Sequence, residues 1–383
     1  MIYLDHAATT PIDPSVLAAM APYLHDQHGN PSSTHAQGRA ARAGVERARE
    51  QVADALGVPP LEVLFTSGGT EADNAAIKGI AWAARDAGRG AHLVTTQIEH
   101  HAVLETMTWL AEHQGFSLDV VPVQPDGIVD PQRVLDAVRP DTVLVSVMAA
   151  NNEIGTLQPL ADIGPSLAEQ GVVFHCDAVQ GFGRAELQPG AWGIGALSLS
   201  AHKFNGPKGV GVLMLRRDVA VQPLLHGGGQ ERGVRSGTFN SAGIVGCGAA
   251  AELSAATAPA EIPRLRALRD RLLDDLLAVD GVALNGDCER RLPHNLNVAV
   301  TGCDGEALLL GLDAAGVCVS TGSACQSGAT EPSHVLEAIG APADQGHVRF
   351  TLGRTTTGDD VAGAAAAFTD VVKRLRDTGG GFV

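Results

Sequence analysis

The sequence predicts an α/β protein, with a large domain on a mostly parallel, doubly wound sheet and a smaller α+β domain. From about residue 60 to 215, short apolar runs alternate with helical patterns, as in strands joined by helices. Apolar residues make up 45% of the 383 residues and aromatic residues 4%, which favours strands buried on both faces. After about residue 255 a long charged helical pattern leads to short strands. We therefore expect a large domain over residues 13–255 and a small domain from residues 1–12 and 256–383.

The predicted elements follow in order along the chain. VLFTSGGTEADNAAIKGIAWAARDAG indicates a strand, a glycine loop and then a helix with an apolar face; HLVTTQ then leads to a helix near 101–113. Further strands are indicated by TVLVSVM, VVFHCDA, ALSLSAHK and GVGVLMLRR, and in the last third by NLNVAV, GVCVS and HVRFTLG. Ligands of doubly wound sheets bind beyond the carboxyl ends of the strands. Polar residues gather at those ends: Thr70, His100, Asn152, Asp177 and Lys203.

Net charge and composition argue against several classes of function. The net charge of −16 argues against direct contact with nucleic acid, which depends on clustered Lys and Arg. No apolar run approaches the roughly 18–20 residues of a membrane span, and the N-terminus has no signal-peptide pattern. The six cysteines are scattered without metal-ligand spacing, so we expect no metal site and a reducing, cytoplasmic location.

Two strand ends carry side chains suited to holding a cofactor. A carboxylate at Asp177 can keep a ring nitrogen protonated, and Gln180 lies three residues further on; an isolated Asp more commonly caps the next turn. Lys203 follows an apolar strand, where partial desolvation lowers the pKa of a lysine and allows a Schiff base, although most lysines are simply solvated. There are four lysines, and the other three lie on predicted helices or in a turn.

Other candidates have equally plain alternatives. SGGTE can hold a phosphate at a helix N-terminus or be an ordinary helix start. Of the adjacent His100 and His101, sequence logic prefers neither as a group stacked on a planar ring. Cys325 lies in a small, polar stretch typical of a reactive loop thiol, whereas Cys318 alternates with valines and is predicted to be core. Arg349 either clamps a carboxylate or faces solvent from an edge strand.

Taken together, the motifs resemble the cysteine desulfurases, in the NifS/IscS-like branch of the class V aminotransferase-fold enzymes. They run in family order from residue 3 to about 357: YLDHAATTP, NPSSTHAQG, FTSGGTEADNAAIKG, EHHAVLE, NNEIGTLQP, HCDAVQGFG, SAHKFNGPKG, GGGQERGVRSGT, GSACQSGATEPSHVL and VRFTLGRTTT. The resemblance implies a fold-type I homodimer that binds pyridoxal 5'-phosphate at the subunit interface. It also implies L-cysteine as substrate and transfer of sulfur to an acceptor protein for iron–sulfur cluster assembly or for tRNA or cofactor thiolation.

Roles for individual residues follow from the resemblance by position. Lys203 would form the Schiff base, Cys325 would be the nucleophile, and His100 would stack on the ring. Asn152 and Arg349 would face the substrate carboxylate. The remaining cofactor contacts implied are Asp177 at the ring nitrogen, Gln180 at the phenolic oxygen, and Gly69, Thr70, Ser200, His202 and the other subunit's Thr238 at the phosphate.

The sequence departs from the family pattern in three places. EHH stands where EHK is commoner, and Asn205 where an aromatic residue is frequent. After the helix ending near Arg376 only DTGGGFV follows, whereas housekeeping members carry a longer extension that helps dock the iron–sulfur scaffold, so the acceptor stays open. Two rival functions remain: a selenocysteine or cysteine C–S lyase of the same fold, for which Cys325 would be dispensable, and a catalytically silent scaffold for a sulfur carrier.

Overall fold

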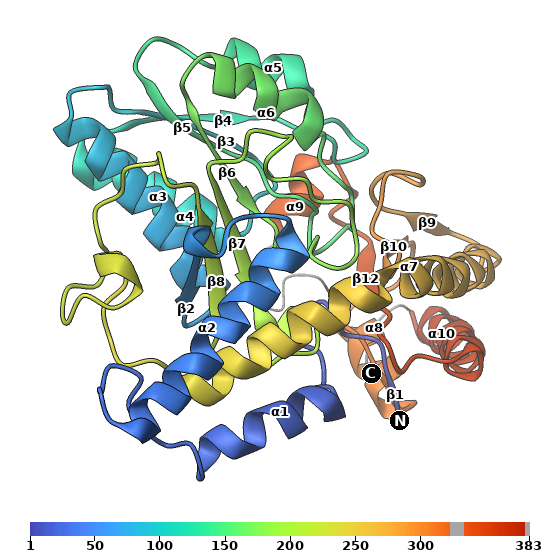
Figure 1. The fold of residues 1–383 in the computed structure, drawn as a ribbon. Coiled ribbons are helices and arrows are strands. Elements are labelled where there is room, and N and C mark those ends of the chain that lie inside the picture. The colour runs from blue at the N-terminus through green and yellow to red at the C-terminus, as the bar shows by residue number, and fades with distance from the viewer. Residues whose placement is uncertain (322–332, 380–383) are drawn as a thin grey trace.

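A mostly parallel sheet forms the centre of the fold, in a computed structural model that describes residues 1–321 and 333–379 (Figure 1). Within these residues its strands run in the order β2-β8-β7-β6-β5-β3-β4. Neighbouring strands from β4 to β7 pair in parallel, while β8 runs antiparallel to both β7 and β2. The predicted doubly wound α/β sheet is confirmed. Its strands are β2 (Val63–Thr66), β3 (His92–Thr96), β4 (Ser117–Val121), β5 (Thr142–Ser146), β6 (Val173–Asp177), β7 (Ala196–Ser200) and β8 (Gly211–Leu215).

This strand order brings the polar strand ends to one edge of the sheet. Because β2 and β7 are each antiparallel to β8, they run in the same direction as one another and as β3, β5 and β6. The residues that follow these strands therefore meet: Gly69 after β2, His100 after β3, Asn152 after β5, Asp177 at the end of β6 and Lys203 after β7.

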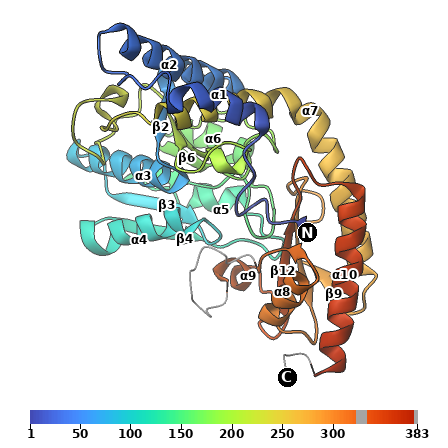
Figure 2. The same ribbon diagram turned by 90° about the horizontal axis from the view of Figure 1, so that it is seen from below.

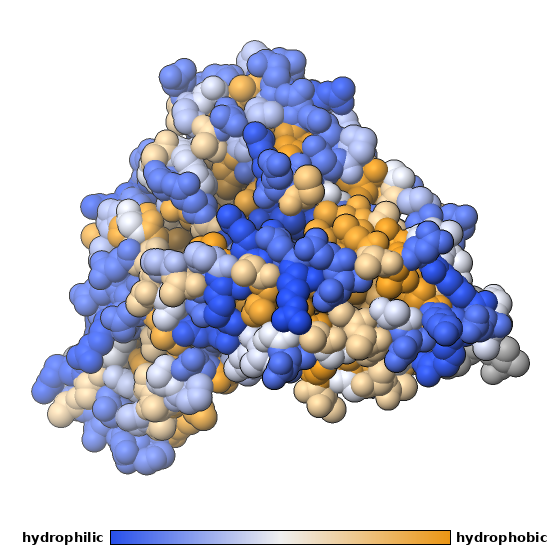
Figure 3. All heavy atoms as spheres, turned by 90° about the vertical axis from the view of Figure 1, so that its right-hand side faces the viewer, coloured by the Kyte–Doolittle hydropathy of each residue, from blue (hydrophilic) through white to orange (hydrophobic). Residues whose placement is uncertain are grey.

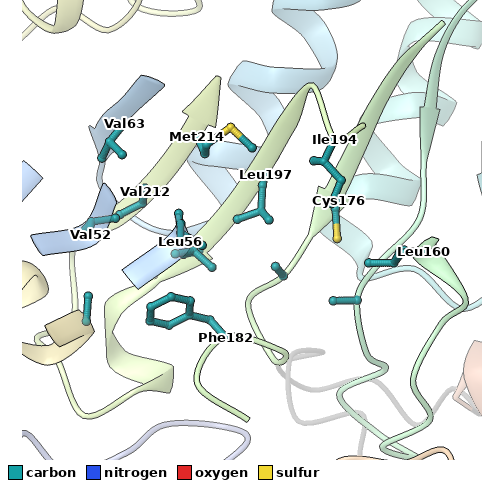
Figure 4. Packing of buried hydrophobic residues seen from close by; sticks show 14 of the residues in the cluster. Val52, Leu56, Val63, Leu160, Cys176, Phe182, Ile194, Leu197, Val212 and Met214 are labelled. Atoms are coloured by element: carbon teal, nitrogen blue, oxygen red, sulfur yellow. The ribbon is translucent and has the colours of Figure 1, made fainter. Parts of the chain in front are cut away.

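Helices cover both faces of the sheet. One face packs against α1 (Pro14–Leu24), α2 (Ala36–Leu56), α5 (Pro131–Asp136), α6 (Leu160–Glu169) and the first half of α7 (Ser241–Leu277). The other face packs against α3 (Gly69–Asp86) and α4 (His101–Gln114). Figure 4 shows Cys176 of β6 among the aliphatic side chains of the first face, beside Ile194 and Leu197. This thiol is therefore part of the core.

Helix α7 links the two parts of the molecule and begins earlier than the sequence pattern suggests. The charged pattern predicted a helix after about residue 255, whereas the helix begins at Ser241. Its first half is rich in Ala and Gly and lies close against α2. A Cβ at Gly248 would lie 2.5 Å from the Ala48 Cα, so only glycine allows this approach. The boundary expected at residue 255 falls inside this continuous helix.

The last third of the chain forms a second core around a small antiparallel sheet. The sheet has the order β12-β10-β9, and the N-terminal strand β1 pairs in parallel with β11 beside it. Helix α10 lies along the second half of α7 (Figure 2). Cys318, predicted to be core, is only half-buried on β11. The elements are β1 (Ile2–Tyr3), β9 (Val282–Leu284), β10 (Asn295–Val300), β11 (Val317–Cys318), β12 (Gly346–Thr351), α8 (Gly305–Ala314), α9 (His334–Ala338) and α10 (Gly358–Asp377).

Three short 3-10 helices complete the described secondary structure: η1 (Pro60–Glu62), η2 (Ala201–Lys203) and η3 (Glu231–Gly233). The side of the molecule that carries α10 and β9 has hydrophilic side chains over much of its surface and an apolar area to the right (Figure 3). Among the described residues, no helix combines the length and apolar character needed to cross a membrane.

Candidate active site

A pocket of about 1240 Å³ opens where the strand ends meet. Its walls come from the N-terminal segment, the starts of α3 and α4, and the residues that follow β5, β6 and β7. The volume is ample for a small cofactor together with a substrate. Ten of the twelve predicted site residues line it: Gly69, Thr70, His100, Asn152, Asp177, Gln180, Ser200, His202, Lys203 and Arg349.

Lys203 is held at this pocket by backbone carbonyl groups. Strand β7 ends at Ser200, and the 3-10 turn η2 then carries Lys203. Its Nζ donates to the carbonyl oxygens of Ala7 and Ala8, at 2.6 and 2.8 Å. The N-terminal segment thus fixes the position of the amine, which a nucleophilic lysine requires.

Asp177 provides a buried carboxylate near Lys203. The backbone N–H of Val179 donates to its Oδ1 at 2.9 Å. Burial raises the pKa of Asp177 to about 6, against the opposing effects of that N–H and of the charge on Lys203. At neutral pH Asp177 is therefore ionised and can pair with a cationic ring nitrogen. Beside it, the buried Oε1 of Gln180 has no hydrogen-bond partner among the described residues.

The start of α3 forms a cradle without side chains in the way. The helix begins at Gly69, and its N-cap residue Gly68 makes no side-chain cap. A Cβ at Gly69 would lie 2.9 Å from the Val179 Cγ2 and 3.4 Å from the Ser200 Cβ, so a larger residue would crowd this wall. Free N–H groups at such a helix start bind anions. Thr70, the second residue of the helix, is exposed at the same place.

Both histidines predicted for the site are neutral at physiological pH. Burial, followed by the charge on Lys203, lowers the pKa of His100 and of His202 to about 4. The Nδ1 of His100 accepts from the Ala102 N–H at 3.1 Å, which leaves its proton on Nε2. The neighbouring His101 instead lies against the His334 ring, with centroids 4.6 Å apart.

Arg349 is buried, contrary to the solvent-facing alternative. Its side chain is 2% exposed, because the N-terminal segment covers strand β12. Nη2 donates to the Asp5 Oδ1 at 2.9 Å, and Nη1 donates to the backbone oxygen of Asn152 at 3.0 Å. These two bonds orient the guanidinium at the pocket wall, where it can bind a carboxylate.

Two predicted site residues do not line this pocket. Thr238 is exposed, in the segment between η3 and α7. Cys325 lies outside the described residues. Conversely, Lys78 and Lys208 reach the pocket wall, although the sequence patterns set them aside. Lys78 stacks over the Trp109 ring, 4.7 Å from its centroid.

Sequence reasoning missed an ion pair that supports the cradle. Glu71, in the first turn of α3, pairs with Arg235 at 2.7 Å and also accepts from the Ser67 N–H at 3.0 Å. Arg235 neutralises a carboxylate that would otherwise oppose an anion at this helix start. The motif GGGQERGVRSGT contains Arg235, but the sequence separation of 164 between the partners hides the pairing.

Comparison with known proteins decides the family. The family model described as aminotransferase class V matches residues 2–363. The chain belongs to the class V aminotransferases. Members of this family with the NifS-like fold depend on pyridoxal 5'-phosphate, so that compound is the cofactor.

Individual relatives locate the chain within the class V aminotransferases. It is 47% identical to the cysteine desulfurase IscS of Methanosarcina thermophila, over 98% of this chain and 93% of the relative. It is 48% identical to an IscS-like cysteine desulfurase of Mycobacterium tuberculosis, over 98% of this chain and 97% of the relative. A solved NifS-like protein superimposes with a TM-score of 0.91 at 38% identity, covering 98% of this chain and 100% of that one. The resemblance to the NifS/IscS-like cysteine desulfurases is thereby confirmed.

The pocket residues fit pyridoxal phosphate. The open helix start at Gly69 suits the phosphate, ionised Asp177 suits a protonated ring nitrogen, and the Lys203 amine is positioned for a Schiff base. The buried amide oxygen of Gln180 has no hydrogen-bond partner among the described residues, so it can accept a hydrogen bond from a bound polar group. The described residues contain no cluster of three or more His, Cys, Asp or Glu side chains suited to a metal ion.

Proposed function

We propose that this protein converts L-cysteine into L-alanine and takes up the removed sulfur as a persulfide on Cys325. The observation that carries the proposal is the pocket itself, in which Lys203, Asp177 and the open start of α3 surround one space. The relatives named as cysteine desulfurases support the choice of substrate. In the overall step, cysteine and the Cys325 thiol give alanine and the Cys325 persulfide, so no outside oxidant or reductant is required.

Binding of the cofactor falls to three groups of residues in this proposal. The N–H groups at the start of α3, with Thr70, Ser200 and His202, hold the phosphate. Asp177 pairs with the ring nitrogen and Gln180 with the phenolic oxygen, while His100 lies against the ring. Bound pyridoxal phosphate supplies an electron sink for the carbanion at the substrate Cα.

Substrate binding and proton transfer involve residues of the opposite wall. Arg349 and Asn152 bind the carboxylate of cysteine, since the guanidinium is already oriented by Asp5. Once the substrate has displaced the Lys203 amine, the Nζ of Lys203 carries the proton that leaves the substrate Cα. Neutral His100 lines the pocket, carries its proton on Nε2 and can exchange a proton there.

Persulfide formation requires the Cys325 thiolate to attack the substrate sulfur. The bond from the substrate Cβ to sulfur breaks, its electron pair stays with the carbon, and a proton completes the alanine methyl group. The persulfide sulfur then passes to an acceptor protein, such as an iron–sulfur scaffold or a tRNA thiolation enzyme. We also propose a homodimer, in which Thr238 of the partner subunit reaches the phosphate; its exposure in one chain supports this role. The large and small domains would divide near the middle of α7.

Product analysis tests the function directly. Purified protein reconstituted with pyridoxal phosphate should form alanine from L-cysteine and, with dithiothreitol present, release an equal amount of sulfide. Lys203→Ala is the matched control and should form neither product. Protein that binds the cofactor but yields pyruvate and ammonia in place of alanine would reassign it as a C–S lyase. Absence of any bound cofactor would favour a silent scaffold.

A further inference from the structure

Two buried acids, Asp73 and Glu99, form a cluster with Asp177, and the reaction as proposed uses neither of these two directly. Asp73 is 1% exposed, lies on the buried side of α3 and belongs to the pocket wall. Its Oδ1 lies 3.6 Å from the His175 Nε2. His175 precedes Asp177 by two residues on β6, and both of its ring nitrogens meet serine hydroxyls: Ser146 at 2.8 Å and Ser198 at 3.1 Å.

A third acid, Glu99, completes the cluster from the end of β3. It is fully buried, and its Oε1 accepts from the Thr96 hydroxyl at 2.7 Å and from the Met148 N–H at 2.9 Å. Its Oε2 has no hydrogen-bond partner among the described residues. The same three acids affect the buried thiol of Cys176. Burial raises the pKa of this thiol most, and the negative charges of Asp177, Glu99 and Asp73 raise it further.

Positive charge near these acids is scarce. Among the described residues, neither Asp73 nor Glu99 forms an ion pair with Lys or Arg. The charge on Lys203, in contrast, lowers the pKa of Asp177. Three ionised carboxylates so close together and away from water would repel one another strongly. At least one of these three carboxyl groups must therefore be protonated.

The geometry argues against an ion pair between Asp73 and His175, and the buried Oδ1 of Asp73 has no hydrogen-bond partner among the described residues, so a negative charge there would be uncompensated. A charge-assisted hydrogen bond between the two would be about 2.7–2.9 Å long, whereas the atoms lie 3.6 Å apart. Burial lowers the pKa of His175 to about 3, so the ring is neutral. Burial, followed by the charge of Asp177, raises the pKa of Asp73 well above its usual range. Burial also raises the pKa of Glu99 to about 8.

We propose that Asp73 is a positioning residue that keeps its proton beside His175, so that, with Glu99 also protonated, the negative charge of the cluster resides on Asp177. The inference rests on the proposed function, because it concerns the group that faces the cofactor ring. An ionised Asp73 would raise the pKa of Asp177 by like-charge repulsion and weaken its hold on a protonated ring nitrogen. The described groups that face the cluster are His175 on β6, Ser146 on β5, Ser198 on β7, and Lys203 and His100 on the pocket side, whereas the Cys176 thiol lies on the opposite face of the sheet.

Infrared spectroscopy of the full-length protein with its cofactor tests the proposal without any turnover. A protonated carboxyl group has a C=O stretching band separate from that of a carboxylate. At pH 8, protein labelled with carbon-13 in the aspartate side-chain carboxyl should show such a band, shifted by the label. The band should vanish in Asp73→Asn and persist in Asp177→Asn, the matched control. A second, unlabelled band should decline as the pH rises through about 8, and be absent in Glu99→Gln.

Several outcomes would overturn the proposal. Wild-type protein with no label-shifted band at pH 8 excludes a protonated aspartate, and this result stands even if Asp73→Asn fails to fold. A band that persists in Asp73→Asn, or vanishes in Asp177→Asn instead, places the proton elsewhere. These bands are independent of cysteine turnover. A protein that shows them but forms no alanine would refute the proposed function and leave the proton on Asp73 established.

Discussion

Replacement of Arg349 by alanine separates a substrate-binding role from a structural one. The side chain is 2% exposed and donates to the Asp5 carboxylate at 2.9 Å and to the Asn152 carbonyl at 3.0 Å. Breaking such a buried pair costs about 3–5 kcal/mol of folding free energy. Loss of one charged partner of the substrate carboxylate costs about 2–3 kcal/mol of binding, which corresponds to a rise in KM for cysteine of about 30- to 150-fold.

Steady-state alanine formation and urea unfolding measure these two effects. Asp5→Asn is the matched control, because its amide oxygen can still accept from the guanidinium while the substrate-binding charge of Arg349 remains. We expect Asp5→Asn to lower stability but to change KM much less than Arg349→Ala does. An unchanged KM in Arg349→Ala, or the same KM increase in both variants, would assign Arg349 to structure alone.

Three further predictions concern the cofactor and the pH dependence of stability. Lys203→Ala should abolish turnover and the visible absorbance of bound pyridoxal phosphate, and borohydride reduction with peptide mapping should label Lys203; a label on Lys208 would show that the wrong lysine was assigned. Burial raises the pKa of Glu99 from 4.5 to about 8, so the folded state favours its protonated form. The unfolding free energy of the wild type, relative to Glu99→Gln, should therefore fall as the pH rises from about 4.5 to about 8, and parallel urea results for both proteins would contradict this. Arg235→Ala leaves Glu71 without its ion-pair partner beside the phosphate cradle and should weaken cofactor binding, measured by equilibrium dialysis, about ten-fold. The double variant Arg235→Ala with Glu71→Gln should recover cofactor binding. An equal loss of binding in the double variant would refute the charge argument.

The parallel sheet and the strand-end residues were predictable because they depend on local pattern. Alternating apolar runs and helices fix the sheet class, and the carboxyl-end rule then predicts that Asp177 and Lys203 lie together. The start of α7 was placed too late because its Ala- and Gly-rich half lacks the charged pattern of its second half. Its helical state depends instead on close packing against α2, as at Gly248.

Contacts between distant segments could not be predicted from the sequence. The burial of Arg349 depends on Asp5, which lies 344 residues away in the chain. The half-exposure of Cys318 follows from pairing of its strand with the short N-terminal strand β1, which alternation with valines does not reveal. The role proposed for Asp73 likewise requires the positions of β5, β6 and β7, since His175 on β6, which lies beside Asp73, is held by Ser146 on β5 and Ser198 on β7.

Formation of a persulfide on Cys325 can be followed with radiolabelled sulfur from cysteine. Wild-type protein should keep the label under non-reducing conditions and lose it with dithiothreitol, and peptide mapping should find it on Cys325. Cys325→Ser should keep the colour of the bound cofactor, respond spectrally to cysteine, and yet carry no label and release almost no sulfide. If Cys325→Ser releases sulfide at the wild-type rate, the persulfide mechanism is contradicted and the protein is a lyase.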